Sequence, residues 1–181
     1  RASTVLNGLN FCKVTEGSNT VSWYFAYDVR NGGSQDNSRY VGSNAWVVMA
    51  INYYQYITGD STYNTLANNA LNWISKFQAS STLLDTYGGF SGGLNASNVA
   101  ITWMSTEHNA DCYSAFKYRS ILTGNSIYST QAERIRTFMT NELWRTSPTC
   151  NYFSSSDSTF GTGYGDNSHY LDAQTWTQLS L

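Results

Sequence analysis

Residues 109–132 read NADCYSAFKYRSILTGNSIYSTQA, and they decide the fold because they repeat a pattern found earlier in the chain. Residues 44–67, NAWVVMAINYYQYITGDSTYNTLA, align with them at a constant offset of 65 without a gap and match at ten of twenty-four positions. The identical pairs are Asn44/Asn109, Ala45/Ala110, Ala50/Ala115, Tyr53/Tyr118, Thr58/Thr123, Gly59/Gly124, Ser61/Ser126, Tyr63/Tyr128, Thr65/Thr130 and Ala67/Ala132. Similarity at a fixed period indicates one supersecondary unit used repeatedly.

Each copy has the pattern of an antiparallel helical hairpin. In the first copy, Ser43 would cap a helix from Asn44 to about Ile57, a Thr-Gly-Asp turn would end it, and a second helix would run over about 61–78. Apolar spacing also predicts a short helix over 3–12. The expected inward residues are Trp46, Val47, Ala50, Tyr53 and Tyr54 in the first helix of the hairpin, and Leu66, Ala70, Ile74 and Phe77 in the second.

A third copy begins near the C-terminus. Trp176 falls one period beyond an aspartate at 111 and two beyond Trp46, and the Asp-Asn-Ser-x-Tyr pattern of 36–40 returns at 166–170. Leu171 to Leu181 predicts the start of another inner helix. We therefore expect a single domain over 1–181 with units of about 65 residues, at about 36–100, 101–165 and 166–181. We also expect a longer protein, or completion of the packing by neighbouring chains.

The composition excludes some partners and favours others. Ten Lys and Arg against twelve Asp and Glu give a net charge of −2, and no basic block argues for nucleic acid. No apolar run approaches the roughly 20 residues that insert into a membrane. Aromatic residues make up 15% of a chain rich in Ser, Thr, Asn and Gly, which is typical of proteins that meet carbohydrate outside cells. A compositional bias of the source organism would give the same pattern.

Cysteines and surface motifs add little chemistry. Cys12, Cys112 and Cys150 allow one disulfide, and Cys12 with Cys150 is the preferred pair because Cys112 lies on an expected buried helix face. No Cys-x-x-Cys or Cys/His cluster indicates a metal, and no cofactor is expected. The sequon at Asn95 could carry an N-glycan, whereas residues 1–4 have no signal-peptide core.

Several motifs resemble a known superfamily. GGFSGGL at 88–94, STEHNADCYSAF at 105–116 and LDAQTW at 171–176, together with the repeated hairpins, resemble the six-hairpin (α/α)6 toroid glycosidases and bacterial six-hairpin glycosidase-like proteins. The resemblance covers nearly all of 36–181. It implies an all-α fold with about three of six hairpins present, and a sugar-binding cleft at the rim where loops enter the inner helices.

Two carboxylates occupy equivalent repeat positions on that rim. Glu107 plus 65 is Asp172, and both stand at the N-terminal ends of expected inner helices. Glycoside hydrolysis needs a protonated carboxyl and an ionised one, so Glu107, beside Trp103, is the candidate acid and Asp172, or Asp166 upstream, the candidate base. Acids at helix N-termini are also stabilised by the helix dipole, which is the structural alternative.

His108 and Asp111 are further catalytic candidates. His108 could neutralise a substrate for elimination, with Tyr113 or Tyr170 as base, as in a polysaccharide lyase, or could be a structural hydrogen-bonding partner. Asp111 replaces the tryptophan of the other two copies. It could hold His108, bind substrate or face solvent.

Substrate contacts are expected from aromatic side chains, of which about two should touch ligand because most repeat tryptophans are core. The candidates are Trp46, Trp103, Trp176, Tyr87 and Phe90, with Asn109 and Asp166 as polar contacts. Asn109 also recurs at Asn44, which indicates a scaffold role. We expect an extracellular or cell-surface protein that hydrolyses glycosidic bonds in an oligo- or polysaccharide. The alternatives are a non-catalytic structural or glycan-binding protein, self-assembling or glycosylated, and a lyase.

Overall fold

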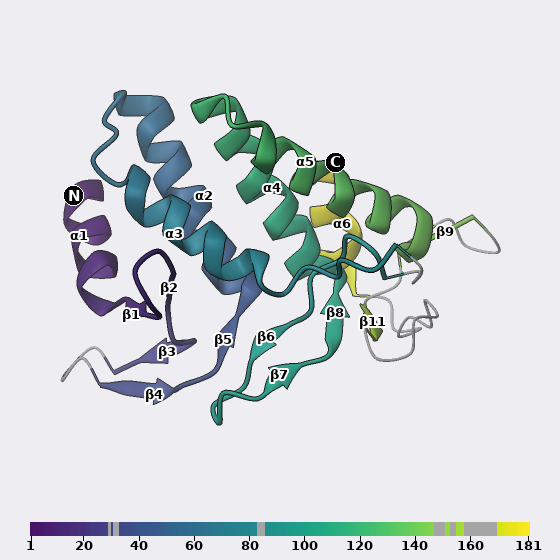
Figure 1. Cartoon of the computed structure of the whole chain (residues 1–181), viewed down its shortest axis with the longest axis horizontal. Coiled ribbons are helices and arrows are strands. Elements are labelled where there is room, and N and C mark those ends of the chain that lie inside the picture. Colours follow the sequence, from purple (N-terminus) through teal and green to yellow (C-terminus); the bar gives the residue numbers. More distant parts are fainter. Residues whose placement is uncertain (29, 31–32, 83–85, 147–150, 153–154, 158–169) are drawn as a thin grey trace.

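The computed structural model describes residues 1–28, 30, 33–82, 86–146, 151–152, 155–157 and 170–181. It is predominantly helical (Figure 1). The helices are α1 (Ala2–Cys12), α2 (Val41–Thr58), α3 (Asn64–Ser75), α4 (Thr106–Thr123), α5 (Ser126–Phe138) and α6 (Leu171–Ser180), and a π-helical turn over Met139–Leu143 extends α5.

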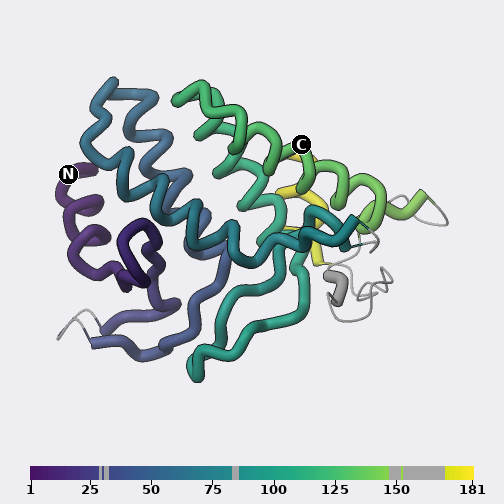
Figure 2. The backbone as a smooth tube through the Cα atoms, in the orientation of Figure 1, coloured from purple at the N-terminus to yellow at the C-terminus, as the bar shows by residue number. Residues whose placement is uncertain are grey.

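Two antiparallel hairpins, α2/α3 and α4/α5, form the body of the molecule, as the repeat predicts. Both are closed by the same turn, in which Gly59 and Gly124 adopt φ values of 70° and 68° and donate their N–H groups to Gln55 and Ser120. This left-handed cap favours glycine because it has no Cβ to clash. The tube in Figure 2 shows α3 and α5 as one layer over α2 and α4. Helix α6 packs against α4 as a third inner helix.

Short antiparallel strands gather beyond the N-terminal ends of the inner helices (Figure 1). The pairings are β1 (Val14–Thr15) with β2 (Val21–Ser22), β3 (Ala26–Tyr27) with β4 (Ser34–Asp36), β5 (Arg39–Tyr40) with β6 (Gly93–Leu94) and β7 (Ala100–Ile101), β8 (Trp103–Ser105) with β11 (Ser155–Asp157), and β9 (Trp144–Arg145) with β10 (Asn151–Tyr152). Strands β5 and β8 lead directly into α2 and α4, so this end of the bundle is a rim of loops and strands.

Helix α2 differs from the prediction at its start. It begins at Val41, and its N-cap is the extended residue Tyr40, so Ser43 lies inside the first turn and the predicted Ser43 cap is wrong. The Val41 N–H donates to Gly92 in the strand neighbouring β5, at 3.1 Å. Strand pairing therefore continues to the first residue of the helix and fixes its start.

The buried face of α2 is also rotated from the predicted one. Trp46, Ala50 and Tyr53 are exposed, because α2 packs on α3 and α4 through smaller side chains. The buried residues are Val41, Gly42, Asn44, Ala45, Val48, Ile51 and Asn52. In α3, which ends at Ser75, the predicted Leu66, Ala70 and Ile74 are buried. Phe77 lies beyond the end of the helix and is half-buried against the core.

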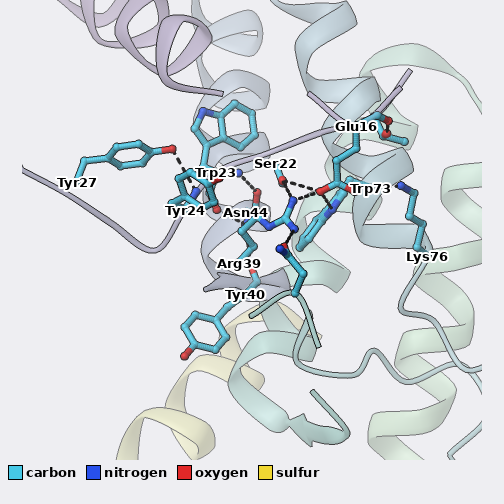
Figure 3. Close-up of polar contacts among 12 residues, drawn as sticks. Glu16, Ser22, Trp23, Tyr24, Tyr27, Arg39, Tyr40, Asn44, Trp73 and Lys76 are labelled. Atoms are coloured by element: carbon cyan, nitrogen blue, oxygen red, sulfur yellow. Dashed lines mark hydrogen bonds and ion pairs between the residues drawn. The ribbon is translucent and has the colours of Figure 1, made fainter. Parts of the chain in front are cut away.

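One side-chain amide, at the same repeat position in each inner helix, joins that helix to a buried aromatic residue of another segment. The amide oxygen accepts the aromatic residue's backbone N–H, and the amide nitrogen donates to its carbonyl. The pairs and the two distances are Asn44 with Trp23 (2.8 and 3.3 Å), Asn109 with Phe90 (2.7 and 3.1 Å), and Gln174 with Tyr152 (2.8 and 2.8 Å). We call this contact the amide clamp, and Figure 3 shows the first one.

Two buried arginines complete the polar framework. Arg119 is completely buried and donates to Asn68, Gln55 and Asn64, neutral amide partners on the first hairpin, and burial lowers its pKa. Arg39 pairs with Glu16, and Figure 3 shows the two side chains meeting beside α3. Arg119 therefore joins the two hairpins, and Arg39 fixes the N-terminal segment on them.

We expect Asn109→Ala to lower the free energy of unfolding by about 2–4 kcal/mol, because it leaves the buried N–H and C=O of Phe90 without partners. Urea unfolding followed by circular dichroism measures this. Asn72→Ala is the matched control, since the exposed Asn72 makes a single bond to the Asn19 carbonyl, and its cost should stay below about 1 kcal/mol. Equal costs for the two variants would contradict the clamp's role.

Candidate functional site

Helices α4 and α6 bring Glu107 and Asp172 to the same rim. Both carboxylates lie in the first turn of their helices and are exposed. Partial burial raises the pKa of Glu107, and the negative charge of Asp172 raises it further. Ser105, the last residue of β8, caps α4 by accepting the His108 N–H at 3.3 Å. The predicted register of the two acids is therefore realised as an electrostatic interaction between them.

An aromatic cluster surrounds His108 beside Glu107. The ring centroids of Tyr40 and Trp103 lie 6.1 Å apart and are stacked, and the His108 ring lies 6.0 Å from Tyr40 and 5.3 Å from Trp103. Burial lowers the pKa of His108 to about 4, so the imidazole is neutral at physiological pH. Its Nδ1 atom is buried, with no hydrogen-bond partner in the described part of the chain. Trp103 keeps 38% of its surface exposed.

Asp111 lies one turn below Glu107 and is buried, with 1% of its surface exposed. Trp176 donates its indole N–H to Asp111 Oδ1 at 2.6 Å. Burial raises the pKa of Asp111 to about 7, the nearby indoles of Trp176 and Trp46 lower it, and the charge of Glu107 raises it. Asp111 therefore does not face solvent, which was one of the alternatives left open by the sequence.

The structure removes some predicted contacts from the site. Phe90 and Asn109 are completely buried, so neither can touch a ligand; Phe90 packs on Phe116, and Asn109 forms the second amide clamp. Tyr87 lies against α5, where the Arg134 guanidinium is 5.6 Å from its ring centre, and not beside Glu107. The scaffold role inferred for Asn109 from the repeat is thus confirmed.

Some predicted residues fall outside the described ranges. They are Asp166 and Cys150, and with Cys150 the proposed disulfide to Cys12. Of the alternative lyase bases, Tyr170 is exposed and Tyr113 is buried. Within the described ranges no group of three or more His, Cys, Asp and Glu side chains is arranged to hold a metal ion.

Gly42 is a site residue that the sequence reasoning missed. A Cβ at this position would lie 2.5 Å from His108 Cδ2 and 3.0 Å from Asp111 Oδ2, so α2 and α4 approach closely here. The signal was available, because Gly42 is the repeat equivalent of Glu107 and Asp172. The first copy thus has a glycine where the other two have acids, and the missing side chain leaves room for His108.

Solved structures share this fold. A family 76 glycoside hydrolase from a bovine Bacteroides thetaiotaomicron strain superposes with a TM-score of 0.59 at 15% identity, over 76% of this chain and 27% of that one. D-mannose isomerase gives 0.65 at 10%, over 87% and 39%, and a family 76 mannosidase from Bacteroides thetaiotaomicron gives 0.60 at 12%, over 81% and 36%. No family model matches the sequence, and no curated protein is significantly similar to it.

The matched structures are six-hairpin toroids, so this chain has part of a glycosidase-like α/α toroid fold. It spans between about a quarter and two fifths of their length, as the covered shares show. No helix in the described ranges combines the length and apolar character needed to cross a membrane.

We expect Gly42→Ala to lower the free energy of unfolding by about 1–3 kcal/mol, because the new methyl group would overlap the His108 ring. Gly8→Ala in α1 is the control, since a Cβ there meets nothing within 4 Å, and alanine should be neutral or stabilising by up to about 1 kcal/mol. Thermal and urea unfolding of both variants measure the difference. A neutral Gly42→Ala would contradict the close approach.

Asp111 should impose a pH dependence on stability. Its pKa is raised in the folded state, so the folded chain binds more protons than the unfolded chain between about pH 4 and 7, and stability is lost as the pH rises through this window. We expect Asp111→Asn to remove a loss on the order of 2–4 kcal/mol. The depressed pKa of His108 acts in the opposite direction, but both proteins keep it. Urea unfolding of both proteins at several pH values measures the free energy of unfolding as a function of pH. The same pH dependence in the parent and in Asp111→Asn would refute this prediction.

Proposed function

We propose that the chain is part of an extracellular carbohydrate-active enzyme that hydrolyses glycosidic bonds, with Glu107 as general acid. The observation that carries the proposal is the carboxyl of Glu107, exposed on the rim, with a pKa raised by partial burial and by Asp172. Such a carboxyl keeps its proton closer to neutral pH than an ordinary glutamate does, which a proton donor to a leaving oxygen requires. The toroid fold shared with family 76 hydrolases supports the reaction class.

In this mechanism the two acids divide the work. Glu107 donates its proton to the glycosidic oxygen, while Asp172 is the carboxylate that either activates water or attacks the anomeric carbon. The exposed part of Trp103 offers a surface for the sugar next to Glu107. His108, neutral and enclosed by Tyr40 and Trp103, supports these rings and does not supply a charge.

The names of the similar structures support a choice of substrates for this proposal. Two of them are family 76 enzymes, one a mannosidase, and the third is D-mannose isomerase. Mannose-containing glycans are therefore the first substrates to test, together with isomerisation of free D-mannose as a separate assay.

A non-catalytic glycan-binding protein is the second candidate. The chain spans 27–39% of the length of the similar enzymes, so parts of their rims have no counterpart in it. Binding of a glycan without turnover under any assay condition would favour this function over hydrolysis.

We expect Glu107→Gln to reduce hydrolysis of a manno-oligosaccharide by at least about a hundredfold, because the amide cannot donate the catalytic proton. Glu133→Gln on α5 is the matched control; Glu133 pairs with Arg136 on the outer layer, and its variant should keep full activity. Reducing-sugar release measures both.

The pH profile gives a second readout. Activity that needs protonated Glu107 falls as the pH rises through its pKa, and the raised pKa moves this fall toward neutral pH. Unchanged hydrolysis by a folded Glu107→Gln variant would eliminate Glu107 as the acid.

A further inference from the structure

The residues that occupy one repeat position in the three inner helices lie next to one another. Trp46 of α2, Asp111 of α4 and Trp176 of α6 are separated by 65 residues each along the sequence. The two indole rings are stacked, with centroids 5.2 Å apart and planes 18° from parallel. The Trp176 indole donates to the Asp111 carboxyl on the middle helix, and the Trp46 indole lies near enough to lower the pKa of that carboxyl. Asp111 therefore holds one ring of the stack directly and the other through the stacking contact.

Asp111 is placed to hold these rings and not to reach a substrate. Its side chain is 1% exposed, and Gly42 closes over its second oxygen from α2. Acid catalysis requires hydrogen-bond contact with the reacting oxygen, and neither carboxyl oxygen has a free approach. The buried carboxylate accepts the indole N–H of the partly buried Trp176, and so gives that donor a partner.

Trp46 offers an open surface that its position in the fold does not otherwise explain. Half of the surface of Trp46 is exposed, whereas Trp176, the other ring of the stack, is partly buried. The stack lies one helical turn below Glu107, which corresponds to a rise of about 6 Å. A flat indole fixed at this depth is suited to the apolar face of a sugar ring whose next linkage lies near the rim.

We propose that the Trp46–Trp176 stack is an aromatic subsite for one sugar ring, and that Asp111 is a positioning residue that fixes the Trp176 indole and, through the stack, the Trp46 indole. This inference rests on the proposed carbohydrate function, but it does not need Glu107 to be the acid. It assigns to Asp111 a role different from that of the two rim carboxylates.

Mannotriose binding measured by calorimetry tests the subsite. It is carried out in the Glu107→Gln background so that the ligand is not consumed. Trp46→Ala should weaken binding about tenfold or more, as loss of an aromatic anchor does. Trp144→Phe is the control, because the Trp144 ring packs edge-on against Tyr152 and has no ring contact with Trp46 or Trp176 among the described residues, and its affinity should be unchanged. Equal affinity of Trp46→Ala and the parent would overturn the subsite.

A conservative substitution separates positioning from catalysis. Asp111→Asn keeps an acceptor oxygen for an indole, so it should raise KM several-fold while kcat stays within about threefold of the parent. Asp111→Ala should weaken binding as much as Trp46→Ala does. A catalytic acid would instead give an equal and large loss of kcat in both Asp111 variants, and that result would overturn the positioning role.

Circular dichroism detects the stack without any ligand, because two stacked indoles couple their electronic transitions and give a paired band. Trp46→Ala and Asp111→Ala should abolish this band, and Asp111→Asn should retain part of it. Retention of the full band in Asp111→Ala contradicts the positioning role, and absence of mannotriose binding by the parent contradicts the subsite.

Hydrolysis that survives Glu107→Gln, with binding still lost in Trp46→Ala, would refute the proposed acid and leave the subsite intact.

Discussion

The amide clamp is the contact on which the rest of this structure depends. Asn44, Asn109 and Gln174 each satisfy both backbone groups of a buried aromatic residue in another segment. Buried backbone groups left without partners cost free energy, and Trp23, Phe90 and Tyr152, in the segments that precede the inner helices, would have such groups. Two hydrogen bonds from the same repeat position remove that cost. They also fix each segment against the first turn of its inner helix.

The site follows from that register. Because each clamp fixes the first turn of an inner helix, positions 42, 107 and 172 reach the rim together, and positions 46, 111 and 176 meet one turn lower. The three copies have the same contact at the clamp but different residues at these two levels. At the upper level Gly42 makes room for His108, while Glu107 and Asp172 occupy the equivalent positions on the other two helices. At the lower level a buried acid accepts a hydrogen bond from one of two stacked tryptophans. A uniform scaffold thus supports a non-uniform site.

Electrostatics gives the acids distinct properties despite their proximity. Glu107 remains exposed and is affected by Asp172, whereas Asp111 is enclosed and ionises near neutral pH. Burial disfavours the charged form of each group, so it also keeps His108 neutral. The same principle acts on the framework, where the buried Arg119 has neutral amides as partners and a lowered pKa.

The sequence by itself determined the hairpins, their period, the Thr-Gly turns, the scaffold role of Asn109 and the pairing of Glu107 with Asp172. These depend on local spacing and on one constant offset, which a linear chain displays directly. It did not determine which face of α2 is buried, that Phe90 is core, that Gln174 replaces Asn109 in the third clamp, or that Asp111 lies beneath two indoles. Those features depend on how far apart neighbouring helices lie and on which side each one faces, and only tertiary packing sets these quantities.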